Sequence, residues 1–215
     1  MTKVKICGLT KAEDAITAAA AGADLLGFIM AESRRRVTIG QARDLVQAVK
    51  AHGYTGELVG VFVNEPADTI NQVAAYAGFG RVQLSGDETP EDARNVNIPI
   101  IKVIRVSPAT QTEHISAEIF TWREATGPKT LFLLDTAQRG AYGGTGKVFN
   151  WQVAAGVAQT EPIIVAGGLT PKNVAELVLK VKPFGADVSS GVETGGLKDG
   201  VKIAAFVRAA KMAGV

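Results

Sequence analysis

The 215-residue sequence has few of the residues that mark several common classes of protein. Its one cysteine, Cys7, excludes an internal disulfide framework and suits a reducing compartment. No stretch approaches the roughly 18 consecutive apolar residues of a membrane-spanning helix, because Asp24 interrupts the longest candidate. Residues 1–5 also lack the unbroken apolar run of a signal peptide. We therefore expect a soluble, cytoplasmic protein.

Neither sign of charge dominates the sequence. The 23 Lys and Arg residues against 21 Asp and Glu give a formal net charge of +2, and the dense basic run Arg34-Arg35-Arg36 is short enough for a solvated loop. We expect no nucleic-acid or membrane partner. A content of 47% hydrophobic residues can bury a sizeable core. No linker interrupts the sequence, so residues 1–215 are predicted to form a single domain.

Several catalytic and cofactor motifs are also missing. The two histidines, His52 and His114, belong to predicted helices or loops, and no HExxH or Cys/His cluster indicates zinc. No GxGxxG follows a predicted strand, so a dinucleotide site is not expected. Gly146-Lys147 resembles part of a P-loop, but Val148 stands where that motif needs Ser or Thr. Proton transfer would therefore depend on carboxylates or on the thiol.

Short apolar runs rich in β-branched residues alternate with longer amphipathic segments along the whole chain. This alternation predicts βαβ units with parallel strands. The predicted strands are Val4–Cys7, Leu25–Met30, Leu58–Val63, Arg81–Leu84, Ile100–Ile104, Thr130–Leu134, Ile163–Ala166 and Ala186–Ser189. The predicted helices include Ala12–Ala21, Gln41–His52, Thr69–Ala77, Asn173–Val181 and Gly200–Ala213, and the segment Gln111–Thr126 has the weakest apolar stripe.

An open doubly wound sheet would satisfy the same alternation, so the number of units decides the fold class. Eight units of about 27 residues each favour an α/β fold with a single compact (β/α)8 barrel, a TIM barrel with short loops. Such a barrel carries its reactive residues at the C-terminal ends of its strands. Those ends hold Cys7, the loop 33–37, Asn64, Ser85, Arg105, Asp135, Gly167-Gly168 and Ser189-Ser190-Gly191.

The two last strand ends are rich in glycine and serine. Glycines let backbone N–H groups approach an anion, and barrel enzymes often bind phosphate with the loops after strands seven and eight. Either turn alone could simply be tight, but the pair predicts a phosphate site at Gly167, Gly168, Ser189, Ser190 and Gly191. A third cluster, Gly143, Gly144 and Gly146, predicts a loop that closes over a substrate.

Two residues are candidates for acid–base chemistry. Asp135 ends the apolar run 131–134, where partial desolvation would raise its pKa toward that of a useful general acid; the alternative is a turn-forming Asp. Cys7 ends the first strand, where a helix N-terminus and nearby cations favour a thiolate base; the alternative is a small buried hydrophobe. Arg35 could supply a cation and grip a substrate carboxylate, although physical reasoning alone leaves the choice among Arg34, Arg35 and Arg36 open.

Taken together, these segments resemble the phosphoribosylanthranilate isomerases over essentially the whole chain. The matching segments are Val4–Thr10, Gly27–Ile29, Ser33–Val37, Gly60–Asn64, Val82–Leu84, Leu134–Thr136, Gly143–Lys147, Ala166–Leu169 and Asp187–Glu193. The resemblance implies an Amadori rearrangement of N-(5′-phosphoribosyl)anthranilate to 1-(2-carboxyphenylamino)-1-deoxyribulose 5-phosphate in tryptophan biosynthesis. It implies no metal or organic cofactor, a small phosphosugar as the partner, and a monomer or a homodimer.

The resemblance also implies a role for each candidate. Asp135 is the general acid that protonates the furanose ring oxygen, and Cys7 is the base that removes the C2′ proton. Arg35 matches the anchor for the anthranilate carboxylate, and the last two turns hold the phosphate. Three positions depart from the expected pattern: Ser85 stands where a histidine commonly follows Val-Gln-Leu, Arg34 replaces Pro or Lys, and Asn150 replaces an Asp, which caps a helix about equally well.

Two alternative functions fit the same barrel. The aldose–ketose isomerase of histidine biosynthesis, or an enzyme that accepts both substrates, uses aspartates at the first and sixth strands, and Cys7 in the first position argues against it. A binding protein that has kept only the phosphate pocket is the other alternative, because a fold does not by itself imply an activity. The presence of both Cys7 and Asp135 argues against that reading.

Overall fold

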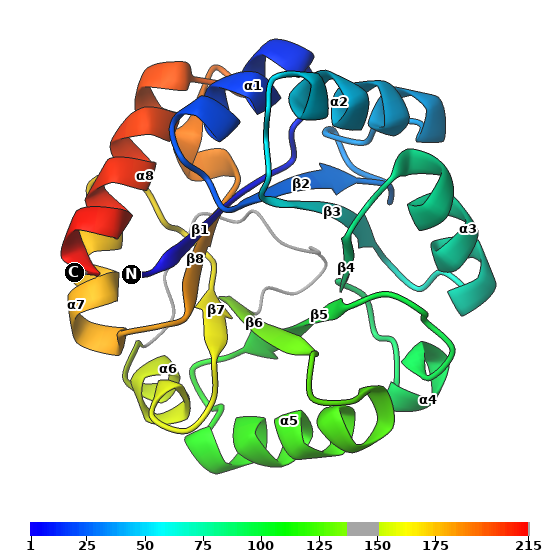
Figure 1. Ribbon diagram of the computed structural model, residues 1–215. Helices are drawn as coiled ribbons and strands as arrows, with labels where there is room; N and C mark the ends of the chain where they lie inside the picture. The colour runs from blue at the N-terminus through cyan, green and yellow to red at the C-terminus, as the bar shows by residue number, and fades with distance from the viewer. Residues whose placement is uncertain (137–150, 215) are drawn as a thin grey trace.

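The computed structural model describes residues 1–136 and 151–214, and these form a closed barrel of eight parallel strands inside a ring of helices (Figure 1). The strands are β1 (Lys3–Cys7), β2 (Leu25–Ile29), β3 (Glu57–Phe62), β4 (Arg81–Leu84), β5 (Ile100–Val106), β6 (Leu131–Thr136), β7 (Ile163–Val165) and β8 (Gly185–Val188). The predicted (β/α)8 barrel is confirmed. The open doubly wound sheet is excluded, because β1 pairs with β8 and closes the barrel.

Helices follow the strands and cover the outside of the barrel (Figure 1). They are α1 (Ala12–Ala20), α2 (Ile39–Ala51), α3 (Ala67–Ala77), α4 (Pro90–Ala93), α5 (Thr112–Thr126), α6 (Trp151–Ala158), α7 (Val174–Val181) and α8 (Gly200–Ala213). The segment with the weakest apolar stripe forms α5, which has 15 residues. Three buried side chains three or four residues apart, Ile115, Ile119 and Trp122, are enough to hold it against the strands.

The apolar core has two parts, because alternate residues of a strand point to opposite sides of the barrel wall. The larger part lies between strands and helices and includes Val4 and Ile6 of β1. The smaller part fills the barrel and includes Leu25, Val59 and Ile101, among others. On β1 the alternation sends Lys5 and Cys7 inward, where Lys5 pairs with an aspartate and Cys7 lines a cavity.

The chain after β8 contains an element that the sequence reasoning missed. A short 3₁₀ helix, η1 (Ser190–Val192), leads into an antiparallel hairpin of β9 (Glu193–Thr194) and β10 (Leu197–Lys198). The turn between them is Gly195-Gly196, and both glycines have positive φ, at 59° and 83°. A two-residue turn with positive φ at both positions suits the twist of a hairpin. This hairpin carries the charged side chains of Glu193 and Lys198 to the mouth of the barrel.

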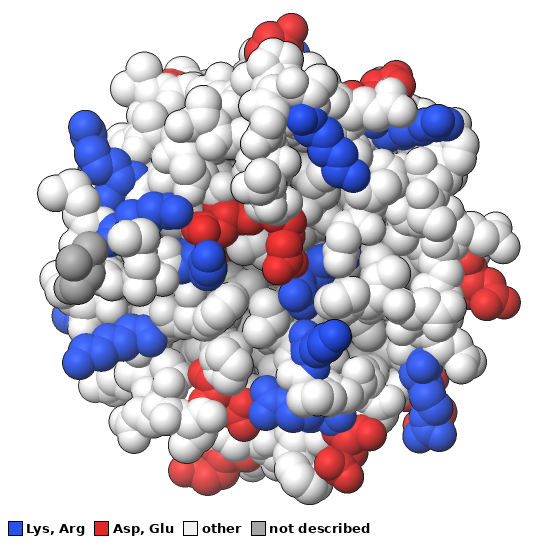
Figure 2. All heavy atoms as spheres, viewed as in Figure 1, with Lys and Arg blue, Asp and Glu red and all other residues white. Residues whose placement is uncertain are grey.

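Acidic and basic side chains interleave around the barrel on the face shown in Figure 2, so they form no patch of one sign there. Several pair with each other at the starts of strands, as Lys3 does with Asp24 at 3.1 Å. Among the described residues, no helix combines the length and the apolar composition that a membrane crossing requires.

Candidate active site

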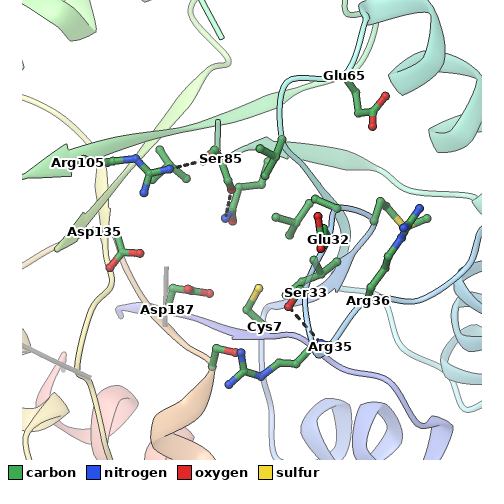
Figure 3. Close-up of a pocket in the computed structure, with 18 residues that line it drawn as sticks. Cys7, Glu32, Ser33, Arg35, Arg36, Glu65, Ser85, Arg105, Asp135 and Asp187 are labelled. Carbon is green, nitrogen blue, oxygen red and sulfur yellow. Dashed lines mark hydrogen bonds between the residues drawn. The ribbon is translucent and has the colours of Figure 1, made fainter. Parts of the chain in front are cut away.

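A cavity of about 780 Å³ lies at the C-terminal ends of the strands, within the usual range for small-molecule sites (Figure 3). It is lined by residues from β1 to β6 and from β8, and by the loop that follows β2. Three residues predicted from the sequence as acid, base and carboxylate anchor, Asp135, Cys7 and Arg35, all line it. The structure thus brings together groups that lie up to 128 positions apart, from residue 7 to residue 135.

Asp135 lies near the end of β6 with its carboxyl directed into the cavity (Figure 3). Burial raises its pKa from 3.8 to about 6, and the neighbouring charge of Asp187 acts in the same direction. The backbone N–H of Thr136, which donates to Oδ1 at 2.8 Å, and the cations of Arg105 and Lys5 oppose this shift without cancelling it. A carboxyl group with such a pKa keeps a protonated fraction near neutrality, as a general acid requires.

Gly167, in the turn after β7, packs directly against this carboxyl group. Its φ is +86°, in the left-handed region that favours glycine, and a Cβ there would lie 2.8 Å from Asp135 Oδ1. The first glycine of the predicted phosphate turn therefore also has a structural role beside Asp135. It leaves the space in which the Asp135 carboxyl group sits.

Cys7 is 6% exposed and lies at the end of β1, across the cavity from Asp135 (Figure 3). Two ammonium groups interact electrostatically with its thiol, one from Lys5 on the same strand and one from Lys198 on β10. Neither lysine was identified from the sequence. Lys5 could have been found, because residues two apart on a strand share a face. The contact of Lys198 depends on the unforeseen hairpin.

Arg35 is the buried member of the arginine run. Its side chain is 13% exposed, whereas that of Arg34 is 56% exposed. Ser33 Oγ accepts a hydrogen bond from the Arg35 backbone N–H, and Glu193 holds the guanidinium through Nε at 2.7 Å and Nη2 at 3.1 Å. In Figure 3 Arg36 points along the rim, away from Cys7. Tertiary structure thus selects Arg35 among the three as the guanidinium beside the thiol.

Glu193 ties the hairpin to this corner of the cavity. Its carboxylate accepts from Arg34 at 2.6 Å, from Arg35, and from Lys198 at 3.1 Å. Burial alone would raise the Glu193 pKa, but the hydrogen bond from Arg35 and the charge of Lys198 outweigh it and lower the pKa. Lys198 also donates to the carbonyl oxygen of Ser189 at 2.8 Å, which fixes the start of the last turn.

The two turns proposed for phosphate lie against each other. A Cβ added at Gly191 would come within 1.7 Å of the carbonyl oxygen of Leu169, so the turns after β7 and β8 are in contact. The turn after β8 begins η1, a short extra helix of the kind that barrel enzymes use in phosphate sites. Of the five candidate residues, Ser189 lines the cavity itself, and Gly167, Gly168, Ser190 and Gly191 lie beside it on the same rim.

The wall formed by β4 and β5 is polar. Gln83 donates from its amide to Ser85 Oγ at 3.0 Å, and Arg105 donates to the Ser85 carbonyl oxygen at 2.6 Å (Figure 3). Gln83 Oε1 is buried without a hydrogen-bond partner. Because the Ser85 side chain is small, the polar groups of Gln83 and Arg105 stay at the cavity wall, where a larger residue at position 85 would cover them.

The predicted substrate loop at Gly143, Gly144 and Gly146 lies outside the described residues. In the described parts of the chain, no group of three or more His, Cys, Asp or Glu side chains is arranged to hold a metal ion.

Comparison with known proteins identifies the family. The family model of N-(5′-phosphoribosyl)anthranilate (PRA) isomerase matches residues 4–209. The chain belongs to the phosphoribosylanthranilate isomerase family. A phosphoribosylanthranilate isomerase of Dehalococcoides mccartyi is 43% identical to it over 211 residues, covering 98% of this chain and 96% of the relative.

Solved phosphoribosylanthranilate isomerases share the fold over nearly their whole length. The structure from Thermotoga maritima has a TM-score of 0.84 and 36% identity, covering 99% of this chain and all of that one. Another was solved in complex with reduced 1-(o-carboxyphenylamino)-1-deoxyribulose 5-phosphate, with a TM-score of 0.81, 34% identity and the same coverage. The resemblance inferred from the sequence motifs is confirmed.

Proposed function

We propose that this chain isomerises N-(5′-phosphoribosyl)anthranilate to 1-(2-carboxyphenylamino)-1-deoxyribulose 5-phosphate in tryptophan biosynthesis, with Asp135 as general acid and Cys7 as general base. Membership of the phosphoribosylanthranilate isomerase family supports the reaction. The observation that carries the assignment of roles is the raised pKa of Asp135 in the cavity that Cys7 also lines. We further propose that residues 1–215 act as one catalytic domain.

The first step is ring opening. Protonated Asp135 gives its proton to the furanose ring oxygen, the bond from that oxygen to C1′ breaks, and a protonated imine forms between C1′ and the anthranilate nitrogen. A carboxyl group with a pKa of about 6 is protonated in about one molecule in ten at pH 7, enough to act as a donor. Thr136 N–H, at 2.8 Å from Oδ1, holds the carboxyl in place and stabilises the carboxylate left after the transfer.

The second step is proton removal at C2′. The Cys7 thiolate takes the proton, and the electron pair of the C2′–H bond forms a double bond to C1′ while the imine nitrogen becomes an amine. The resulting enolamine then gains a proton at C1′ and loses one from its C2′ hydroxyl, which gives the ketone. Asp135 and Cys7 end with their protons exchanged, and solvent restores them before the next turnover.

Two further groups hold the ends of the substrate. Arg35 binds the anthranilate carboxylate, because its partly buried guanidinium offers the fork geometry that a carboxylate matches. The adjoining turns at Gly167-Gly168 and Ser189-Ser190-Gly191 bind the phosphate through backbone N–H groups. These two anchors set the reacting carbons between Asp135 and Cys7.

The family assignment favours this reaction over that of the aldose–ketose isomerase of histidine biosynthesis. The experiment is to generate phosphoribosylanthranilate in situ and follow the loss of its anthranilate fluorescence, with the histidine-pathway substrate run in parallel. We expect turnover of the first substrate alone. Turnover of the second substrate only would reject the proposed function.

Variants at Cys7 test the assignment of the base. Because general acid–base catalysis contributes about 10²–10⁴-fold, Cys7→Ala should reduce turnover at least a hundredfold. Cys7→Ser should be as poor, since a hydroxyl is far too weak an acid to supply an anion near neutral pH. Cys7→Asp should recover part of the activity. Near-normal turnover by Cys7→Ala would move the search for the base to Asp187.

A further inference from the structure

Lys5 is a buried charge for which the proposed mechanism has no use. Its side chain is 1% exposed and lies inside the barrel, below the floor of the cavity. Buried lysines are rare in proteins, since taking an ammonium group out of water is costly unless a partner compensates. The ammonium group of Lys5 must therefore be compensated by partners inside the barrel.

The partners of Lys5 are both at the site. Nζ donates to Asp187 Oδ1 at 2.8 Å, and its charge interacts electrostatically with the side chain of Cys7. Burial by itself lowers the Lys5 pKa, but the carboxylate of Asp187 and the sulfur of Cys7 together raise it above its usual value. Lys5 is therefore an ammonium group at every pH at which the enzyme works. Its charge acts on the sulfur that the proposed reaction needs as an anion.

Gly27 of β2 leaves the space in which the two groups meet. A Cβ at this position would lie 2.9 Å from Cys7 Sγ and 3.2 Å from Lys5 Nζ. Both groups therefore pack against the same bare backbone position. Any larger residue would push the thiol and the ammonium group out of their present positions.

The charges around the pair come from several strands. Asp187 on β8 neutralises Lys5 directly, and Asp135 on β6 interacts electrostatically with both Lys5 and Asp187. Lys198 on β10 interacts with Cys7 from the other side, and its own charge is shared with Glu193. The guanidinium of Arg35 lies beside the thiol as well, and the carboxylate of Asp187 lines the same cavity (Figure 3).

We propose that Lys5 is a positioning residue for the base: its ammonium group holds Cys7 in the thiolate form, and Asp187 fixes that ammonium group in place. This inference rests on the proposed role of Cys7. An opposite charge within about 4–6 Å favours the ionised form of a titratable group and shifts its pKa by about 1–3 units. The alternative is that Lys5 and Asp187 form an ion pair that only fills the barrel.

The chain offers a direct assay, because Cys7 is its one cysteine. Alkylation by iodoacetamide reports the thiolate without any need for turnover, and its rate can be measured across a range of pH. The main variant is Lys5→Met/Asp187→Asn, which removes both charges and leaves neither partner buried alone. We expect its alkylation midpoint to rise by about 1 pH unit, so that about tenfold less thiolate is present below the midpoint.

A second variant provides a separate test in case the double variant does not fold. Asp187→Asn keeps the ammonium group and removes its neutralising partner, so the alkylation midpoint should move to lower pH. An ion pair that only fills the barrel would leave the midpoint of the Lys5→Met/Asp187→Asn variant where it is in the wild-type enzyme. An unchanged midpoint in either folded variant therefore overturns the inference.

The matched control is a second buried lysine pair inside the barrel, Lys102 and Glu88. Lys102 Nζ lies 2.6 Å from Glu88 Oε2, both side chains are under 5% exposed, and neither lines the cavity. Lys102→Met/Glu88→Gln should lower the thermal midpoint of unfolding as much as the Lys5 variant does. Its alkylation midpoint should stay where it is in the wild-type enzyme. A shift of equal size in this control would show that loosening of the barrel, rather than the charge of Lys5, changes the thiol.

Turnover measured in a Cys7→Asp enzyme distinguishes a failure of this inference from a failure of the proposed function. Aspartate is ionised near neutral pH without help, so in a Cys7→Asp enzyme the Lys5→Met/Asp187→Asn change should lower turnover by less than about threefold. With Cys7 present, the same change should lower it about tenfold. Equal losses in both backgrounds would overturn the role of Lys5 even where Cys7→Ala is inactive. Full activity of Cys7→Ala would reject the base itself, which the alkylation profile does not test.

Discussion

Glu193 holds the guanidinium of Arg35 by its side edge, with Nε 2.7 Å from Oε1 and Nη2 3.1 Å from Oε2. The carboxylate comes from β9 and the arginine from the loop after β2, so the contact joins two segments 158 residues apart. A guanidinium gripped along one edge presents its other edge in a fixed direction. We therefore expect Glu193 to orient Arg35 for a second carboxylate, which we propose is that of the substrate.

Arg35→Ala removes the contact to the substrate carboxylate, which is worth roughly 1.5–3 kcal/mol. KM for phosphoribosylanthranilate should rise by about one to two decades, with a small change in kcat. Arg34→Ala is the control, since its side chain is 56% exposed, and it should change KM by less than about threefold. Equal effects from both would mean that a diffuse positive field recognises the substrate.

Glu193→Gln tests the orienting contact itself. The substitution keeps the size of the side chain but removes the charge that pairs with Arg35, so the guanidinium should lose its fixed direction. Steady-state kinetics should show KM raised about threefold to tenfold, on the scale of one ordinary hydrogen bond, with kcat nearly unchanged. A lower KM would show that Glu193 competes with the substrate for Arg35.

Asp135→Asn should abolish most turnover and also change how stability depends on pH. Because burial raises the Asp135 pKa from 3.8 to about 6, the folded state binds its proton more tightly than the unfolded state. Wild-type stability therefore falls as pH rises from about 4 to about 6, by about 3 kcal/mol from this group. Urea unfolding at several pH values should show Asp135→Asn gaining stability relative to wild type across that range. A constant difference would contradict the raised pKa.

Asp24→Asn is the control of opposite sign. Burial acts to raise the Asp24 pKa, but the backbone N–H of Val4 and the ammonium groups of Lys211 and Lys3 outweigh it and lower the pKa. The unfolded state then binds the proton more tightly, so this group stabilises the fold above its unfolded pKa and less so at lower pH. The Asn variant should therefore lose stability relative to wild type as pH rises from acid values.

Gly167→Ala tests the contact between the seventh turn and the acid. The new Cβ would lie 2.8 Å from Asp135 Oδ1 and closer still to Thr136 Oγ1, so the end of β6 that carries the carboxyl group must move and kcat should fall at least tenfold. Gly127→Ala is a close match, since Gly127 has the same φ of +86° and no neighbour within 4 Å of an added Cβ. It should cost stability through backbone strain alone and leave kcat unchanged. Equal losses of kcat would assign the effect to strain.

The proposed phosphate site at the turns after β7 and β8 can be tested by substitution at Gly191. Gly191→Ala would drive a Cβ into the carbonyl oxygen of Leu169 and force the two turns apart. Inorganic phosphate should inhibit the wild-type enzyme weakly and competitively, and the variant at least tenfold less. Gly195→Ala, on the neighbouring hairpin where an added Cβ meets nothing within 4 Å, should leave the inhibition as it is. A crystal grown in sulfate should hold an anion at these turns, and an anion elsewhere in the mouth would count against them.

Periodicity and local motifs were enough to predict the barrel and most of its site. Each of the eight predicted strands coincides with an observed strand to within two residues at either end, because runs of β-branched residues at the barrel wall are continuous and local. Cys7 and Asp135 could be placed at the cavity from sequence alone, because a barrel gathers the C-terminal ends of its strands at one rim.

The contacts between distant segments came only from the tertiary structure. The choice of Arg35 depends on the hairpin that carries Glu193, and a two-residue turn with two-residue strands leaves too weak a pattern for periodicity to reveal. The contact of Lys5 with Asp187 depends on the closure of β1 against β8, since the two residues are 182 positions apart and charged residues facing into a barrel break the apolar pattern. Sequence fixes which residues reach the mouth, because that follows from strand ends. Closure of the barrel determines which charged residues pair, because only the closed barrel brings strands such as β1 and β8 side by side.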